Sequence, residues 1–301
     1  MQTTSLAAPD DPGTGAGADA DAAAAAEDYC ARLTRRHYEN FPVASFLVPR
    51  ELRPAVRAIY AFARTADDFA DEPEHEGRRL ALLDAWERML RSAFEGRAEH
   101  PVFVALAQAA VRHRLPLRPF LDLLAAFRLD VAKTSYETWD ELRGYCRLSA
   151  EPVGRLMLHL FEQDDAGLLP LSDALCTGLQ LANHWQDVRE DRRRGRVYIP
   201  REAMRRHGLV ETDLDAPRAG KAFGALMQDL VGRARDSFGS ARDLPRRAGG
   251  RLGWQLRLTW LGGMRILEKI ETAGGDTLAH PPRLGYGDAP LLAARAATWR
   301  G

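Results

Sequence analysis

Apolar residues recur at three- and four-residue intervals along most of the chain from Tyr29 onward, and Pro and Gly gather between the periodic stretches. This spacing places apolar side chains on one face of a helix, and good helix formers dominate the same stretches. No stretch alternates apolar and polar residues as a half-buried strand would. We therefore predict an all-α fold, with helices over residues 28–37, 50–72, 76–94, 101–113, 117–132, 137–161, 168–193, 217–242, 250–273 and 289–298.

The first 28 residues differ from this pattern. They contain six acidic residues, no Lys or Arg, and the low-complexity run GTGAGADADAAAAAE, which has little apolar side chain to bury. They also lack the basic and apolar segments of a signal or transit peptide. We predict a disordered acidic tail over residues 1–28, a single domain over residues 29–275 and a C-terminal extension over residues 276–301.

Charge and cysteine content exclude several classes of protein. The 42 basic residues equal the 42 acidic ones, which argues against nucleic-acid binding through bulk charge. Without the acidic tail, the remaining chain carries six more basic than acidic residues. Cys30, Cys146 and Cys176 are too few and too widely spaced to indicate a disulfide framework or a zinc cluster. A cytoplasmic protein is the expectation.

Two polar stripes stand out on two predicted helices. In each stripe the residues are spaced so that all of them fall on one helix face. The first stripe comprises Tyr60, Arg64, Asp67 and Asp71, and the second comprises Gln180, Asn183, Asp187 and Asp191.

Carboxylates one helical turn apart repel one another, so a cation is expected between them. Pairs of hard oxygen ligands suit Mg²⁺, which commonly bridges protein carboxylates to phosphates. A solvated acidic face is the alternative, since most charged residues lie on the surface. The apolar surroundings of the first stripe, with Ile59, Phe62 and Phe69, and the recurrence of the same pattern favour the metal site.

These residues bring the chain to a known family. YAFARTADDFAD and LQLANHWQDVREDRRRGRVYIP closely resemble the two aspartate-rich motifs of squalene and phytoene synthases, and LRGYCRLSAEPVGRLML resembles the kinked helix between them. The resemblance implies a single-domain isoprenoid synthase α-helical bundle with a central cavity. It also implies that Tyr60 and Arg64 contact the substrate diphosphate, that Gln180 lies beside the metal, and that Mg²⁺ is held by Asp67, Asp68, Asp71, Asn183, Asp187 and Asp191.

Within the family, residues 37–68 resemble the bacterial hydroxysqualene synthases of hopanoid gene clusters. That branch implies ionisation of presqualene diphosphate, rearrangement of the cation and quenching by water, with no need for NADPH. A presqualene diphosphate synthase and a hydroxysqualene reductase would then be functional neighbours. The alternatives are a synthase that condenses two farnesyl or geranylgeranyl diphosphates, and a non-catalytic relative that keeps the fold.

Further residues are candidates for the substrate site. Asn40 and Phe41 stand where other members have Ser-Phe, and Gly263 stands where many have a tyrosine. We hypothesise that Gly262 and Gly263 leave room for water to reach the cation, with close helix packing as the alternative.

Four more candidates come from the motifs and the predicted kink. Arg196 and Tyr198 belong to the GRVYIP match, and Tyr145 lies beside the kink. Glu151, which precedes Pro152, is a candidate to orient water.

No window reaches the roughly 20 apolar residues that a spanning helix needs. A substrate as apolar as presqualene diphosphate lies in a bilayer, however. The sequence therefore predicts a cytoplasmic protein that makes peripheral contact with the inner face of the membrane.

Overall fold

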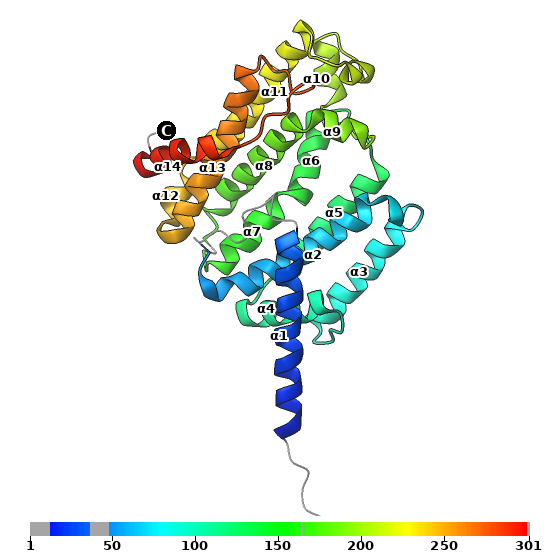
Figure 1. The fold of residues 1–301 in the computed structure, drawn as a ribbon, viewed down its shortest axis with the longest axis vertical. Helices are drawn as coiled ribbons and strands as arrows, with labels where there is room; N and C mark the ends of the chain where they lie inside the picture. The colour runs from blue at the N-terminus through cyan, green and yellow to red at the C-terminus, as the bar shows by residue number, and fades with distance from the viewer. Residues whose placement is uncertain (1–12, 37–47, 164, 300–301) are drawn as a thin grey trace, which may run out of the picture.

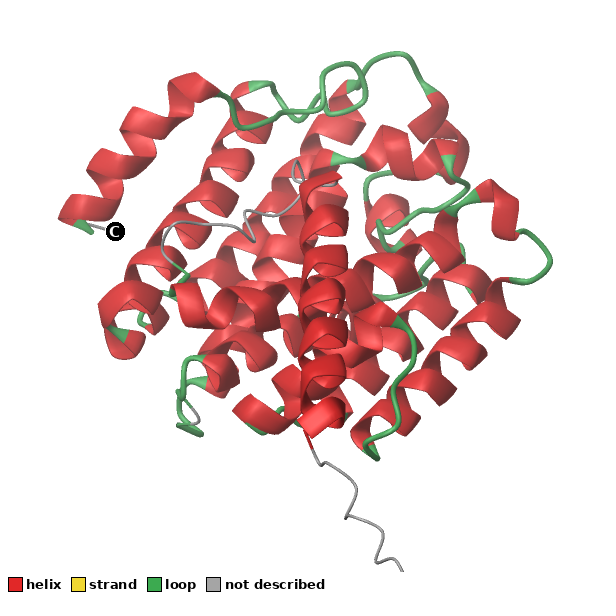
Figure 2. Cartoon of the chain, turned by 60° about the horizontal axis from the view of Figure 1, so that its bottom comes forward, coloured by secondary structure: helices red, strands yellow, loops and turns green. Residues whose placement is uncertain are grey.

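A computed structural model describes residues 13–36, 48–163 and 165–299, which it builds almost entirely of helices (Figure 1 and Figure 2). Within these ranges there is no named strand, only an isolated bridge between Ser135 and Val197. The helices are α1 (Gly13–Arg36), α2 (Arg53–Asp71), α3 (Arg79–Phe94), α4 (Pro101–His113), α5 (Arg118–Ala132), α6 (Trp139–Ser149), α7 (Glu151–Leu160), α8 (Leu169–Gln186), α9 (Val188–Arg193), α10 (Arg201–Arg206), α11 (Lys221–Ser240), α12 (Leu244–Ala248), α13 (Gly250–Thr272) and α14 (Ala289–Thr298).

Short 3₁₀ helices connect some of these elements: η1 (Arg50–Leu52), η2 (Pro73–His75), η3 (Glu211–Asp215) and η4 (Tyr286–Asp288). The all-α prediction is confirmed for the described residues. None of the helices in this part of the chain is long and apolar enough to cross a membrane.

The buried side chains form two hydrophobic cores. One core lies among α1 to α5 and is centred on Phe62, Trp86 and Phe103, with Phe62 and Phe103 in edge contact at 6.2 Å between ring centroids. The other lies among α6, α8, α11 and α13 and includes Trp185 and Phe238. Helices α5 and α7 contribute to both cores, so they join the two halves of the bundle.

The N-terminal prediction is wrong from Gly13 onward, because α1 occupies residues that we expected to be a disordered tail. Its C-terminal half packs against α2 and α4, where Ala26, Cys30 and Ala31 are buried. Small side chains at these three positions allow this close approach. The alanine run before them adds helix propensity, but only Ala26 of that run is buried. Figure 1 shows the other end of α1 extending beyond the bundle. Residues 1–12 lie outside the described residues.

Two predicted helices are interrupted. The helix expected over residues 137–161 is divided at Ala150, because Pro152 in the first turn of α7 cannot donate a hydrogen bond to the preceding turn. Gly154 then lets α7 approach α8 closely, since a Cβ at this position would lie 2.5 Å from the Ser172 Oγ. The helix expected over residues 168–193 is divided at Asp187, whose φ of −102° and ψ of 19° separate α8 from α9.

Candidate active site

The first acidic stripe lies on the last two turns of α2. The Arg64 guanidinium lies between two carboxylates, with Nη1 3.1 Å from Asp67 Oδ2 and Nη2 bonded to Asp68. Tyr60 lies one turn before Arg64 and is partly buried, and burial raises the pKa of its hydroxyl above 10. The helix ends after Asp71 because Pro73 forces the preceding Glu72 into an extended conformation.

The second stripe is carried by two helices instead of one, the 18-residue α8 and the six-residue α9. Asn183 is exposed near the end of α8, Asp187 occupies the break, and Asp191 lies on α9. The Asn183 carbonyl accepts a hydrogen bond from the Asp187 amide at 2.9 Å. Gln180 Nε2 lies 3.3 Å from His184 Nε2, so its amide contacts a histidine of the same helix.

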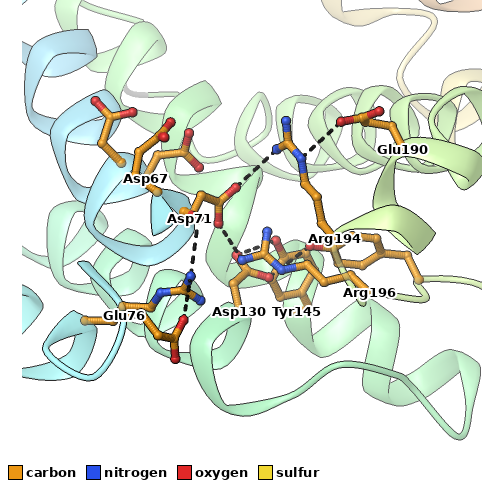
Figure 3. A network of polar contacts seen from close by, with 12 residues as sticks. Asp67, Asp71, Glu76, Asp130, Tyr145, Glu190, Arg194 and Arg196 are labelled. Atoms are coloured by element: carbon orange, nitrogen blue, oxygen red, sulfur yellow. Dashed lines mark hydrogen bonds and ion pairs between the residues drawn. The ribbon is translucent and has the colours of Figure 1, made fainter. Parts of the chain in front are cut away.

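Two arginines connect the stripes. Arg196, which follows α9, forms an ion pair with Asp71 at the end of α2, and Arg194 Nη1 lies 3.4 Å from the same carboxylate (Figure 3). Glu190 holds Arg194 from the other side at 3.4 Å. Between these arginines, Gly195 has a φ of +77°, a left-handed conformation that favours glycine and turns the chain back toward α2.

A further carboxylate, Asp130 near the end of α5, was missed by the sequence reasoning. Its two oxygens accept hydrogen bonds from Tyr145 at 2.9 Å and from Tyr198 at 3.0 Å. Burial raises the pKa of both phenols, so the hydroxyls stay protonated and can donate. Asp130 therefore ties the kinked α6 segment to the residues after α9. In the sequence Asp130 lies two residues after Arg128 on a helix end, a common pattern that did not mark it as a site residue.

The site concentrates negative charge in a partly dehydrated space. Burial, followed by the nearby Asp71 carboxylate, raises the pKa of Asp67 to about 7, although Arg64 opposes the shift. Burial and the Asp187 carboxylate raise the pKa of Asp191 to about 7 in the same way. Asp130 has a pKa raised by burial to about 6, against the lowering effect of Arg196 and the two tyrosines. An additional cation between the stripes would relieve this repulsion.

Asp187 is influenced by an arginine from the C-terminal extension. Burial raises the pKa of Asp187, and the positive charge of Arg283 is the strongest opposing influence. The backbone carbonyl of Arg283 accepts a hydrogen bond from Lys269 Nζ at 2.7 Å, which anchors this segment on α13. No local pattern around Arg283 had indicated that it lies near the second stripe.

The structure favours one of the two interpretations of Gly263. Gly263 has no room for water, because a Cβ there would lie 2.8 Å from Phe238 Cε1 and 2.9 Å from Leu179 Cδ2. This agrees with the alternative interpretation, in which Gly263 allows close helix packing. A Cβ at Gly262 would lie 3.5 Å from Leu284, an ordinary van der Waals contact. A role for Glu151 in orienting water stays a prediction. Glu151 pairs with Arg155 at 3.3 Å, and its pKa is raised by burial and by Asp173.

Other predicted features are only partly described. Asn40 and Phe41 lie outside the described residues. The central cavity stays a prediction, and a hollow of about 10 Å³ lies beside the second stripe, lined in part by His184, Asp191 and Tyr198. His184 stacks on Tyr198 with ring centroids 3.8 Å apart, and burial lowers its pKa to about 3.

The donor set suits a hard cation that keeps part of its water shell. Within residues 13–36, 48–163 and 165–299, no three His, Cys, Asp or Glu side chains are gathered into a preformed metal site. Mg²⁺ needs only one or two protein carboxylates when water and phosphate oxygens complete its coordination. The pairs Asp67 with Asp71 and Asp187 with Asp191 meet that requirement. The arrangement can therefore hold divalent cations and, through them and the arginines, an anionic phosphate group.

Several known proteins are similar to this chain in sequence. The family model for squalene/phytoene synthase matches residues 34–287. A hydroxysqualene synthase of Rhodopseudomonas palustris is 39% identical over 238 residues, which cover 78% of this chain and 80% of the relative. A second, from Zymomonas mobilis, is 45% identical and covers 58% of this chain and 59% of the relative. A 15-cis-phytoene synthase of Synechococcus elongatus is 31% identical, with 83% of this chain and 85% of the relative covered.

Solved structures are similar to this chain as well. The structure of squalene synthase HpnC from Alicyclobacillus acidocaldarius has a TM-score of 0.79 and 45% identity, covering 84% of this chain and 95% of that one. A dehydrosqualene synthase crystallised with a ligand has a TM-score of 0.84 at 24% identity, covers 93% of this chain and 98% of that one, and supports the fold alone.

Proposed function

The chain belongs to the squalene/phytoene synthase family, and from that premise we propose that it is a hydroxysqualene synthase. In this reaction presqualene diphosphate and water give hydroxysqualene and diphosphate. The observation that carries the proposal is the graded similarity: relatives named hydroxysqualene synthase are 39–45% identical, whereas phytoene synthases are 30–32% identical. The facing acidic stripes and their arginines provide a place for the leaving diphosphate.

Mg²⁺ is the proposed cofactor. Asp67, Asp71, Asp187 and Asp191 would hold it, with Asp68 and Asn183 beside them, because their oxygens are the hard ligands that Mg²⁺ prefers. When bound, the metal neutralises charge that develops on the departing diphosphate. We expect no requirement for NADPH.

Three arginine side chains are proposed to bind and orient the diphosphate. Arg64 is fixed by Asp67 and Asp68, and Arg194 and Arg196 are fixed by Asp71, so these guanidinium groups border the gap between the stripes. Guanidinium groups grip phosphate oxygens in two-pronged geometry. Tyr60 adds a hydroxyl donor on the α2 side of the same gap.

The aromatic group around Asp130 is proposed to face the reacting hydrocarbon. The Tyr136 and Tyr198 rings are stacked with centroids 5.8 Å apart, and Tyr145 lies 5.5 Å from Tyr198. Aromatic faces attract cations, so this wall would stabilise a carbocation after the diphosphate leaves. Asp130 positions two of the three rings through their hydroxyl groups.

The test is product analysis with purified protein, Mg²⁺ and detergent-dispersed presqualene diphosphate in ¹⁸O-labelled water. Hydroxysqualene carrying ¹⁸O, formed without NADPH, is the expected product. Squalene that appears only when NADPH is added would overturn the proposal. Asp191→Asn should reduce turnover by about 10²-fold or more. Asp236→Asn, which changes an exposed aspartate on α11, is the matched control and should leave turnover unchanged.

A second candidate is the head-to-head condensation of two farnesyl or geranylgeranyl diphosphates. The similarity to phytoene synthases over 81–83% of the chain favours keeping it. Incubation with farnesyl diphosphate or geranylgeranyl diphosphate in place of presqualene diphosphate separates the two activities, since only a condensing enzyme would release presqualene diphosphate or phytoene from them.

The proposed setting follows from the substrate. A C₃₀ hydrocarbon diphosphate resides in a bilayer, so the protein is proposed to work in the cytoplasm and to contact the inner face of the membrane peripherally. The enzyme that makes presqualene diphosphate and a reductase that consumes hydroxysqualene would act before and after it. Residues 29–275 are the proposed catalytic domain, and Arg283 suggests that the extension over residues 276–301 also serves the site.

A further inference from the structure

One exposed aromatic and basic surface lies far from the acidic stripes in sequence. It is formed by Arg251, Trp254 and Arg257 on the first two turns of α13 and by Trp299 after α14, and is called here the Trp254 surface. Arg251, Trp254 and Arg257 are spaced three residues apart, which places them on one helix face. The Trp254 side chain is 44% exposed, although an aromatic residue of this size usually packs inward.

Specific contacts hold this surface in shape. The Arg257 guanidinium lies 5.0 Å from the Trp254 ring and 5.6 Å from the Trp299 ring, and its Nη1 donates to the Ala296 carbonyl at 3.2 Å. Trp299 packs edge-on against the buried Trp260 at 5.4 Å. The two tryptophans are therefore fixed on either side of one arginine, so presenting them to a partner costs little conformational entropy.

The charge around this surface is of one sign. Residues 244–267 contain five arginines and no acidic residue. Arg246 pairs with Asp243 and Arg247 with Asp165, both at 3.1 Å. By contrast, Arg251 is exposed, and neither it nor Arg257 has a carboxylate partner among the described residues. A partner that neutralises these two guanidinium groups must therefore be anionic.

We propose that the Trp254 surface docks the protein on an anionic lipid bilayer. Tryptophan prefers the headgroup level of a membrane, where its ring is partly buried and its N–H stays wet, and arginines beside it contact lipid phosphates. The fixed tryptophans suit the headgroup level, and the two arginines that lack a carboxylate partner in the described part of the chain suit the lipid phosphates. The expectation that a membrane is present rests on the proposed function, whereas the choice of surface rests on these contacts and charges.

The test is co-sedimentation of the full chain with vesicles of phosphatidylcholine, with and without one-third phosphatidylglycerol, in the absence of substrate and metal. Binding should require phosphatidylglycerol and should weaken as salt is added. Arg251→Ser should weaken it about five-fold, which corresponds to about 1 kcal/mol for one arginine at an anionic surface. Trp254→Ala should weaken it several-fold.

A matched control pair lies on α3, on the opposite side of the molecule in Figure 1. Arg88 is exposed there without an ion pair among the described residues, and Met89 is 43% exposed. Arg88→Ser and Met89→Ala should leave vesicle binding unchanged. Equal losses in both pairs, unchanged binding of the Trp254 and Arg251 variants, or no binding by the wild type would overturn the proposal.

Two further measurements separate the alternatives. If Trp254→Ala changes the sedimentation coefficient of the protein in solution, the surface is a contact between copies of the chain and the membrane proposal is wrong. Turnover of detergent-dispersed presqualene diphosphate should be the same in wild type and Trp254→Ala. Vesicle binding without any turnover would refute the proposed activity but leave the docking surface standing.

Discussion

Gly263 offers a sharp test of how α13 packs against its neighbours. The ring of Phe238 is fully buried, and it lies between two glycines, one on α8 and one on α13. A Cβ at Gly178 would lie 3.1 Å from Phe238 Cδ2, and a Cβ at Gly263 would lie 2.8 Å from Cε1. The ring cannot retreat from either helix, so Gly263→Ala forces a strained rearrangement.

The magnitude follows from two opposing effects. Overpacking a core costs about 1–3 kcal/mol, and the confined ring points to the upper end of that range. Replacing Gly by Ala within a helix returns about 1 kcal/mol. Gly263→Ala should therefore lower the free energy of unfolding by about 2 kcal/mol. Gly232→Ala is the matched control, because Gly232 is exposed within α11 and a Cβ there meets nothing within 4 Å, so it should stabilise by about 1 kcal/mol.

Urea unfolding followed by far-UV circular dichroism measures both changes. Phe238→Leu removes the ring, so Gly263→Ala introduced in that background should be neutral or stabilising, with a coupling free energy of about 3 kcal/mol. Equal midpoints for Gly263→Ala and Gly232→Ala would refute the reasoning. That result would also revive the idea that space at Gly263 admits water to the reaction.

Four further predictions concern the site and its supports. Asp130→Asn leaves one tyrosine hydroxyl facing an amide nitrogen, so one hydrogen bond to a charged acceptor is lost. Such a bond contributes about 1.5–3 kcal/mol, and its loss should lower kcat/KM by roughly 10- to 100-fold. Full activity with an unchanged circular dichroism spectrum would contradict this role. Because the pKa values of Asp67 and Asp191 are raised to about 7, both carboxyls must lose a proton to bind a cation, so calorimetric affinity for Mg²⁺ should rise between about pH 6 and pH 8. The folded chain also holds these protons more tightly than the unfolded chain, so metal-free protein should lose stability as the pH rises from about 4 to 7. A urea midpoint that does not change with pH over this range would argue against the raised pKa values. The pKa of Asp288 is shifted in the opposite direction, because hydrogen bonds from Lys269 Nζ, from the Gly285 amide and from Arg265 lower it. The stabilising effect of this carboxylate is therefore present above about pH 4 and is lost in acid. Asp288→Asn should therefore speed tryptic cleavage within residues 276–301, and an unchanged cleavage pattern would show that this carboxylate does not anchor the segment.

The sequence predicted α2 and its polar stripe well, because a single unbroken helix makes residue spacing equivalent to position in space. The second stripe was less predictable. Its helix is divided at Asp187, and no proline or glycine marks that break in the sequence. The spacing therefore identified the correct residues but not the backbone that carries them.

The residues that connect the stripes show the limit of sequence reasoning more clearly. Asp130 meets its tyrosine partners only after the chain has folded, with Tyr198 68 positions away, so no local pattern could reveal it. Arg196 belonged to a recognisable motif, whereas the contact of Arg194 with Asp71, 123 positions away, had no signal in the sequence. The two interpretations of Gly263 could not be separated in the sequence, because a missing side chain looks the same whether water or a neighbouring ring fills the space.

The division into two hydrophobic cores has a consequence for folding cooperativity. The first acidic stripe belongs to the core formed by α1 to α5, and the second belongs to the core built around α8 and α11. Any ion or diphosphate held by both stripes would thus connect the two cores reversibly. Ligand at 100 times its Kd adds about 2.7 kcal/mol to the native state, and here that energy acts on the joining of the halves. Bound substrate would therefore stabilise the packing of the two cores against each other. That stabilisation would be lost each time the product dissociates.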